Sequence, residues 1–295
     1  MKPCSASRIG GPVLAATAVS VLLACDPPLK QAQLIESPRV LGARVSGADG
    51  KASLQAGQPA SFEVLVAGTE GGLVARFAYN VCETRESGRG VPYCSRPAFA
   101  TGTTELTGAP VAFDVPDSLG DSPFALLGVA CIESEPVLAK DPLAWRCSGA
   151  DSPLGTSFVV RPGSRDFQNN NPDLSELRVR VGRTLVKLEG ALDAPTCADG
   201  APEVEAGVTH PVAVLLGDAA RELQSADLGL ESLQVSLFAT RGLFERQFSF
   251  IDPDATPKSE LTWDAPKSAG PVKQFVVVRD ERGGVSWASW SVCAR

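Results

Sequence analysis

Turn-forming residues interrupt this chain so often that a long helix has little room. Its 28 glycines and 23 prolines are scattered between short apolar runs along 295 residues. Proline disrupts the interior of a helix and glycine costs it backbone entropy, so this spacing favours short strands joined by turns. We therefore predict an all-β fold, with turns at 47–50, 88–90, 116–118, 252–254 and 282–284.

Between these turns, apolar residues repeat with the period of a β-strand. Phe62, Val64 and Val66 alternate with the residues between them, and the runs 177–181 and 233–237 have the same period. Successive side chains of a strand point to opposite faces, so this pattern predicts strands that are buried on one face. Many short strands separated by turns indicate a β-sandwich.

A polar segment divides the chain into two halves. Residues 162–173, Pro-Gly-Ser-Arg-Asp-Phe-Gln-Asn-Asn-Asn-Pro-Asp, are almost devoid of apolar side chains, which is typical of a linker. We predict one β-sandwich domain at 38–161 and a second at 174–295, both of ordinary size.

The two halves also echo each other. Ala56-Gly57 lies 150 residues before Ala206-Gly207, and the apolar run 124–127 lies 151 residues before 275–278. We interpret the echo as one sandwich used twice.

The second half resembles bacterial immunoglobulin-like and cadherin-like domains near its end. Those domains end in a Trp-x-Ala-Pro segment, a glycine-bearing turn, a valine-rich strand and an Asp-x-x-Gly-Gly hairpin. The chain has these features at 263–266, 269–272, 275–280 and 280–284. The first half resembles the opening strands of the same class. The resemblance implies two tandem immunoglobulin-like sandwiches, but it implies no activity because this fold has many functions.

The start of the chain resembles the export signal of a bacterial lipoprotein. Two basic residues precede an uncharged, mostly apolar run at 9–24, and the run closes as Leu22-Leu23-Ala24-Cys25, which resembles a lipobox. The resemblance implies that a signal peptide at 1–24 is cleaved and that Cys25 carries the lipid. The protein would then be anchored in the bacterial cell envelope through Cys25, with 25–37 as its tether.

The same segment is open to two alternative interpretations. An ordinary secretory signal would lead to export without lipid. A membrane-spanning anchor is disfavoured, because the run contains Gly10, Gly11 and Pro12 and is shorter than the ~20 residues that a spanning helix needs.

Charge excludes some classes of partner. Cleavage removes Lys2 and Arg8, so 25 basic residues face 34 acidic ones and the net charge is −9. Nucleic-acid binding and polybasic membrane contacts both need clustered Lys and Arg. We therefore expect no nucleic-acid partner.

The cysteines indicate disulfides. Cys4 leaves with the signal and Cys25 takes the lipid, so six cysteines remain, which is an even number for an oxidising compartment. If each half folds alone, the two in the second half pair with each other, and three pairings remain for the first half. We favour neighbours that bracket turn-forming stretches. The predicted pairs are Cys82 with Cys94, Cys131 with Cys147, and Cys197 with Cys293.

No metal, cofactor or catalytic motif is evident. Zinc sites usually contain closely spaced Cys pairs, whereas this chain has no Cys-x-x-Cys and a single histidine, His210. Gly120-Asp121-Ser122 is similar to the start of one esterase family, but that family places its histidine after an Asp near the C-terminus. No Gly-x-Ser-x-Gly elbow occurs. Acidic pairs such as Glu133 with Glu135 are expected to be solvated turn residues, so we predict no enzymatic activity.

The linker is a candidate calcium site. Cadherin-like domains bind calcium through acidic side chains at domain junctions, and Asn169, Asn171, Asp173 and Glu176 lie there, with the hairpin at 280–281 in reach. Calcium takes six to eight oxygen ligands, several of them carboxylates. This segment is richer in asparagine than in acid, so we expect its side chains to cap turns.

The tryptophans suggest a second function. Trp287 and Trp290 are three residues apart, so on a strand they face opposite sides, and an exposed one could stack on a sugar ring. We expect Trp263 and one of this pair to be in a core, as is usual in sandwiches. Exposure of the other would favour carbohydrate binding.

We predict a non-enzymatic, lipid-anchored envelope protein that acts in binding, adhesion or structure, with an envelope protein or a glycan as its partner. A carbohydrate-binding or substrate-capture lipoprotein is the alternative, and a secreted hydrolase is third. Loops far from the anchor, such as 280–284 if it proves distal, are the expected contact surface.

Overall fold

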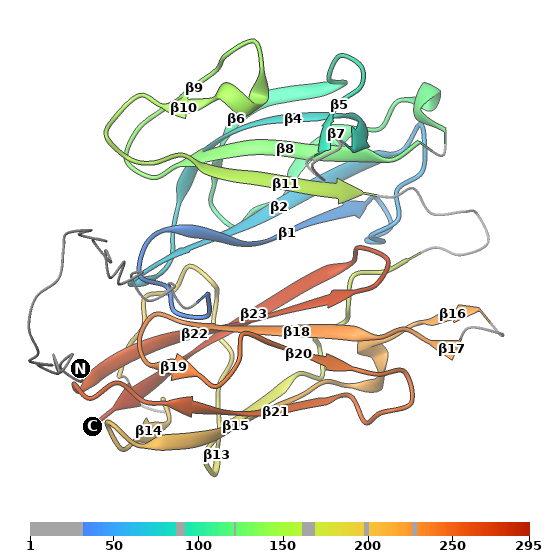
Figure 1. Cartoon of the computed structure of the whole chain (residues 1–295). Helices are drawn as coiled ribbons and strands as arrows, with labels where there is room; N and C mark the ends of the chain where they lie inside the picture. Colours follow the sequence, from blue (N-terminus) through green and yellow to red (C-terminus); the bar gives the residue numbers. More distant parts are fainter. Residues whose placement is uncertain (1–31, 87–91, 121, 161–168, 198–200, 226–228) are drawn as a thin grey trace, which may run out of the picture. The chain divides into compact units, whose positions relative to one another are not determined.

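The computed structural model consists of β-strands and short turns, as the sequence pattern predicts (Figure 1). It describes residues 32–86, 92–120, 122–160, 169–197, 201–225 and 229–295, so Cys25 and the signal lie outside the described residues. The helical elements within these ranges are three single 3-10 turns: η1 (Asp117–Leu119), η2 (Pro142–Ala144) and η3 (Asp218–Ala220). No helix in the described part of the chain is long and apolar enough to cross a membrane.

The first half forms a sandwich of two antiparallel sheets. One sheet has β2 (Pro59–Gly68) at its centre, paired with β1 (Arg39–Gly47), β3 (Gly71–Gly72) and β7 (Val111–Asp114). The other has the order β11 (Leu154–Val160), β8 (Phe124–Cys131), β4 (Ala75–Glu86), and β4 also pairs with β5 (Pro92–Cys94) and β6 (Ala100–Leu106). A small ribbon of β9 (Pro136–Val137) and β10 (Arg146–Cys147) follows β8.

The second half forms a sandwich of two five-stranded sheets. The first sheet has the order β13 (Thr184–Leu185), β12 (Arg178–Val181), β15 (Thr209–Leu215), β21 (Lys258–Asp264), β19 (Leu243–Phe244). The second has the order β14 (Glu203–Val204), β23 (Val285–Ala294), β22 (Gly270–Asp280), β18 (Leu233–Ala239), β20 (Phe248–Ile251). A separate ribbon pairs β16 (Leu223–Ser225) with β17 (Gly229–Leu230).

Both halves use the same strand order. β1, β2 and β7 correspond to β12, β15 and β21, while β4, β8 and β11 correspond to β18, β22 and β23. This order is that of an immunoglobulin-like sandwich. Equivalent hydrogen bonds confirm the match: the Val115 N–H donates to the Gln58 carbonyl at 3.1 Å, and the Ala265 N–H donates to the Val208 carbonyl at 3.0 Å. The offset of 150 residues therefore aligns equivalent positions. The offset of 151 residues does not, because Phe124 points into the core of its own sandwich whereas Phe275 points away from it.

The glycine of the repeated Ala-Gly is required by the backbone conformation. Gly57 and Gly207 both adopt a φ of 74°, which favours glycine, as the chain enters β2 and β15. A side chain at Gly57 would also collide with the Asp117 carboxylate, whereas one at Gly207 would make ordinary contacts with Lys267. The repeated Ala-Gly thus marks the same turn in the two sandwiches.

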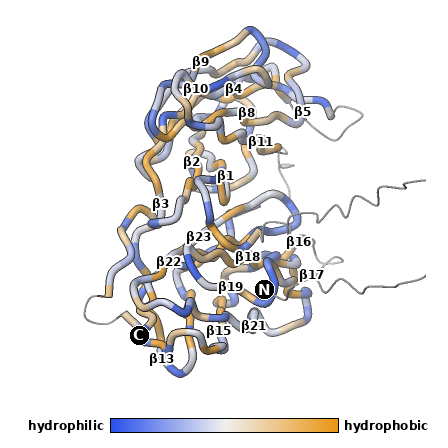
Figure 2. The backbone as a smooth tube through the Cα atoms, turned by 60° about the vertical axis from the view of Figure 1, so that its left-hand side comes forward, coloured by the Kyte–Doolittle hydropathy of each residue, from blue (hydrophilic) through white to orange (hydrophobic). Residues whose placement is uncertain are grey.

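Each sandwich has its own apolar core. Phe62, Phe77 and Phe124 are fully buried in the first, and Phe244, Trp263 and Trp290 in the second. Trp263 takes the place that Phe113, 150 residues earlier, has in the first sandwich. Figure 2 shows that hydrophobic stretches concentrate in the strands of both sandwiches.

A third cluster of buried apolar residues joins the two sandwiches, and we call it the shared face. The residues Gln31–Arg295 accordingly form one compact unit. The sheet of β1 and β2 contributes its outer side, and the sheet of β18, β22 and β23 does the same. The cluster consists of Ile35, Leu41, Leu65, Ala67, Phe238, Phe275, Val277 and Val285.

The shared face corrects the prediction that the strand at 62–67 is buried on one face. Val64 and Val66 pack into the core of the first sandwich, but Leu65 and Ala67 on the opposite side are 4% and 0% exposed. Arg279 of β22 crosses the same boundary and donates to the Leu41 carbonyl at 2.7 Å. Burial lowers the pKa of its guanidinium.

The expected tether at 25–37 is also corrected at its C-terminal end. Leu34 forms a parallel bridge with Ala239 of the second sandwich, and the Ile35 N–H donates to the Ala239 carbonyl at 2.9 Å. Ile35 is completely buried in the shared face. Gln33–Ile35 therefore belong to the folded unit, because their backbone groups and an apolar side chain find partners there.

Candidate functional site

The structure forms the three predicted disulfides. Cys82–Cys94 joins β4 to β5, Cys131–Cys147 joins β8 to β10, and Cys197–Cys293 joins the segment before β14 to β23. All three pairs are the ones that the sequence favoured. Each pair lies within one sandwich, which is what independent folding of the two halves requires.

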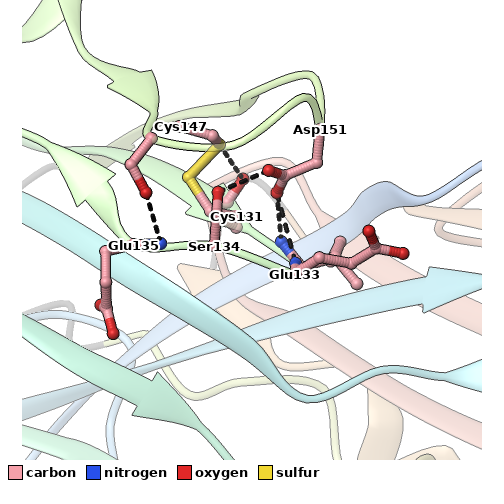
Figure 3. Close-up of a disulfide and its surroundings, with 9 residues drawn as sticks. Cys131, Glu133, Ser134, Glu135, Cys147 and Asp151 are labelled. Atoms are coloured by element: carbon pink, nitrogen blue, oxygen red, sulfur yellow. Dashed lines mark hydrogen bonds between the residues drawn. A yellow bond between two sulfur atoms is a disulfide. The ribbon is translucent and has the colours of Figure 1, made fainter.

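The surroundings of Cys131–Cys147 were tested as a metal site (Figure 3). Its two sulfur atoms and an Asp151 oxygen lie within 4.8 Å of one another. However, the sulfurs are bonded to each other and cannot serve as thiolate ligands. Asp151 accepts bonds from the Ser134 hydroxyl at 2.5 Å and from the Ile132 N–H at 2.9 Å, and these bonds lower its pKa. Asp151 therefore caps the turn after β8.

His210 is the candidate for a catalytic base, and its contacts are with the backbone and an aromatic residue of its own sandwich. It lies in β15 opposite Trp263, and its Nε2 atom is 3.0 Å from the Glu205 carbonyl oxygen. Ser122 follows the η1 turn of the first sandwich, and Asp121 lies outside the described residues. The acidic residues Glu133 and Glu135 are exposed, as expected of turn residues.

The tryptophans divide as the sequence predicts for a core. Trp263 and Trp290 are fully buried, and the Trp290 indole donates to the Gln274 side chain at 2.8 Å. Trp145 packs against Cys131–Cys147. Trp287 is half-buried, and the Arg44 guanidinium lies 4.5 Å from its ring centroid. Its ring is therefore not an open platform, since a cation covers one side.

Trp287 and Arg44 line a cavity at the boundary between the sandwiches. Its volume is about 360 Å³, and its wall combines apolar side chains such as Leu73 and Leu192 with a charged pair. Arg44 donates to the two carboxylate oxygens of Glu63 at 2.8 and 2.9 Å. Bidentate pairing of this kind holds both side chains in fixed positions. The cavity is a candidate binding site that the sequence does not predict.

A second polar group, which we call the junction cluster, lies where the linker meets the hairpin after β22. Its members are Asn169, Glu222, Glu231, Asp280 and Arg282. Arg282 contacts the carboxylates of Glu222 and Glu231 at 2.9 and 3.0 Å. The guanidinium thus supplies, between two acids, the positive charge that a calcium ion would have brought.

Glu231 is the most perturbed acid of the junction cluster. Its side chain is 1% exposed, and it accepts bonds from Arg282 and from the Glu222 N–H. Burial, and secondarily the negative charge of Asp280, raises the pKa of Glu231 to about 7. Burial costs the charged form of a carboxyl more than its neutral form, and the bonds with Arg282 offset part of that cost.

Asparagine side chains of the linker connect the sandwiches. Asn169 donates to the Asp280 carboxylate at 3.0 Å, and its N–H donates to the Ser53 hydroxyl at 2.8 Å. Asn171 donates to the Val45 carbonyl of β1 at 3.2 Å, and its side-chain oxygen accepts from the Val285 N–H of β23 at 2.9 Å. These contacts join parts of the chain that are far apart in sequence, so the expectation that the two asparagines cap turns is wrong. Within the linker it is Asp173 that caps a turn, by accepting from the Ser175 N–H at 2.8 Å.

The junction also corrects the expected contact surface. The sequence predicts the hairpin at 280–284 as a contact surface if it lies far from the anchor. Instead, Asp280 accepts from the N–H groups of Arg282 and Gly284 and from Asn169 of the linker. The hairpin is used to join the two halves, so its polar groups are already bonded.

Comparisons with known proteins give no family. No protein-family model matches the chain, and no curated protein matches it. Among solved structures, red sea bream transglutaminase is 11% identical over 87% of this chain and 31% of that chain, with a TM-score of 0.27. A family 2 β-glucuronidase is 11% identical over 90% of this chain and 21% of its own, with a TM-score of 0.24.

The α2-macroglobulin of Escherichia coli is also similar. It is 11% identical over 89% of this chain and 16% of its own length, with a TM-score of 0.24. This chain thus spans less than a third of each of these structures. Similarity at this level says nothing about activity.

Proposed function

We propose that this chain is a lipid-anchored protein of the bacterial cell envelope that acts as a non-enzymatic binding, adhesion or structural module. The proposal rests on the observation that the side chains best suited to catalysis or metal binding are bonded to other groups of the protein. The six cysteines are paired, His210 contacts a carbonyl, Asp151 caps a turn, and Glu231 is bonded to Arg282. Each of these groups thus has a partner within the fold.

Export supports the same proposal. Disulfides form and persist in oxidising compartments such as the bacterial periplasm. The Leu-Leu-Ala-Cys motif at 22–25 supplies both an export signal and a lipidation site. Cells grown with labelled palmitate should therefore label the protein, and Cys25→Ser should abolish the label. Cys4→Ser is the matched control and should remain labelled, because Cys4 is cleaved off. A labelled Cys25→Ser chain would contradict lipid attachment at this residue.

Absence of catalysis needs its own test. We expect the purified chain and its His210→Ala variant to be equally inactive against ester, peptide and glycoside substrates. A hydrolytic activity that His210→Ala removes would replace the binding proposal with the third candidate, a secreted hydrolase.

Substrate capture is the second candidate, and the cavity beside Trp287 favours it. The apolar wall beside the fixed Arg44–Glu63 pair offers both apolar contacts and hydrogen bonds to a sugar-sized ligand. Titration with oligosaccharides, measured by calorimetry, tests this candidate. Binding should be lost in Trp287→Ala and retained in Leu138→Ala, an exposed position far along the chain from the cavity wall. Equal binding by both variants would exclude this site.

A further inference from the structure

The edge strand β20 lacks the protection that edge strands usually have. Among the strands that the structure describes, it is the last of its sheet and pairs with β18 alone. Natural edges are commonly blunted by lysine, proline or a bulge, because unpaired backbone groups attract other strands. β20 instead has Phe248 and Phe250, which are 44% and 65% exposed and whose rings contact each other.

The free backbone groups of β20 belong to these same two residues. The Leu237 N–H of β18 donates to the Gln247 carbonyl at 3.0 Å. Bonded and non-bonded pairs alternate along an antiparallel ladder, so Ser249 and Ile251 form the next bonded pairs with β18. The N–H and C=O groups of Phe248 and Phe250 therefore point to the open edge.

The exposed phenylalanines continue an interface that the molecule already uses. Phe248 lies opposite Ser236 on β18, and Ser236 lies opposite Val277 on β22. Residues that face each other across strands lie on the same side of a sheet. Because Val277 belongs to the shared face, Phe248 and Phe250 extend that buried apolar surface onto the open edge.

The strand and its flanks are self-complementary about Ser249. The sequence 246–252 reads Arg-Gln-Phe-Ser-Phe-Ile-Asp. A two-fold axis at Ser249 would place Phe248 opposite Phe250 of a second copy, and Arg246 opposite Asp252 of that copy. Arg246 and Asp252 are both exposed and carry opposite charges.

We propose that two copies of this chain associate through antiparallel pairing of their β20 strands, with the two-fold axis at Ser249. Each copy would then bond the N–H and C=O groups of Phe248 to those of Phe250 in the other copy, which gives four hydrogen bonds. Two Arg246–Asp252 pairs would flank them. The two five-stranded sheets would become one continuous sheet, and the interface is isologous, as closed dimers require. This inference uses residues of the second sandwich and does not depend on lipid attachment.

The size of the contact predicts its strength. Two partly exposed phenylalanines offer roughly 200 Å² of apolar surface on each copy. A stable dimer buries about 800 Å² on each partner. We therefore expect a weak dimer, with a dissociation constant of about 10 μM or more.

Charge exchange tests the pairing. The full chain, purified in detergent, would be followed by sedimentation velocity from about 1 μM to about 1 mM. Arg246→Asp alone and Asp252→Arg alone place like charges opposite each other twice in a dimer, so each should weaken association about tenfold. An equimolar mixture of the two variants restores opposite charges at both positions, and it should associate as tightly as the parent chain. Phe250→Ser should weaken association at least as much.

Two controls complete the experiment. Arg178→Asp makes the same charge change on an exposed position of the other sheet and should leave association unchanged. Thermal melting of every variant should match that of the parent chain, which separates lost pairing from lost folding. A chain that stays monomeric to about 1 mM would overturn the proposal. So would a mixture of the charge variants that associates no better than either variant alone. The open edge would then be left for an extended strand of another protein.

Discussion

Glu231 makes the stability of this protein fall as the pH rises through the neutral range. Its carboxyl is 1% exposed, and its pKa is raised from 4.5 to about 7, first by burial and then by the charge of Asp280. The folded chain therefore holds a proton on Glu231 between these two values, whereas the unfolded chain has released it. The stabilisation from that proton is complete below pH 4.5 and is lost as the pH rises through 7.

The size of the effect follows from the two pKa values. Each tenfold change in proton affinity corresponds to about 1.4 kcal/mol, so a rise from 4.5 to about 7 corresponds to about 3 kcal/mol. For a unit of this size, that should lower the melting temperature by roughly 5–10 °C. Asp151, whose pKa is lowered from 3.8, acts in the opposite sense, but only below this window.

Urea unfolding at a series of pH values would measure the effect. We expect the free energy of unfolding of the parent chain to decrease by about 3 kcal/mol, relative to that of Glu231→Gln, between pH 4.5 and pH 7.5. The difference between the two chains isolates Glu231, because every other group titrates in both. Glu133→Gln, at an exposed turn, is the control and should keep the pH dependence of the parent chain. Parallel pH profiles for the parent chain and Glu231→Gln would refute the reasoning.

Three further predictions concern packing and cross-links. Phe275→Ala in the shared face should cost about 3–5 kcal/mol of unfolding free energy in denaturant titrations, because its fully buried ring leaves a cavity; a loss below about 1 kcal/mol would mean that the sandwiches do not pack there. Replacing Cys197 and Cys293 with serine should cost about 4–5 kcal/mol, more than the same change at the short Cys82 loop, since the chain between them is longer; equal losses in calorimetry would argue against the entropic explanation. Gly57→Ala should lower the melting temperature more than Gly207→Ala, because the first collides with Asp117 and the second does not; the reverse order would contradict the described turn.

Local patterns were sufficient to predict the strands, the disulfides and the equivalence of the two halves. The pairing of Cys82 with Cys94 depends on a short turn, and the repeat of Ala-Gly at 56 and 206 depends on a single backbone conformation. Both the disulfide pairing and the turn conformation depend on a few neighbouring residues of the sequence. The prediction that Glu133 and Glu135 are solvated turn residues is also confirmed, because the neighbouring residues determine that position.

The contacts between the halves could not be predicted in this way. Leu65 and Phe275 look like ordinary strand residues, and only the packing of two outer faces explains why both sides of their strands are buried. A signal was nevertheless present. The runs 64–67 and 275–278 are apolar without interruption, which is typical of strands covered on both faces. The bonds of Asn171 to β1 and β23 gave no sequence signal, because they join backbone groups far apart in the chain.

The docking of Gln33–Ile35 determines where mechanical load would enter the folded unit. A pull on the N-terminal side of the chain reaches the contact of Leu34 with Ala239, on β18 of the second sandwich, before it reaches β1 of the first. The hydrogen bonds at Ala239 and the buried Ile35 side chain would resist that pull together. Tension would thus be divided between the two sandwiches. Release of this short segment would appear as an abrupt extension of the chain at low force, before either sandwich unfolds.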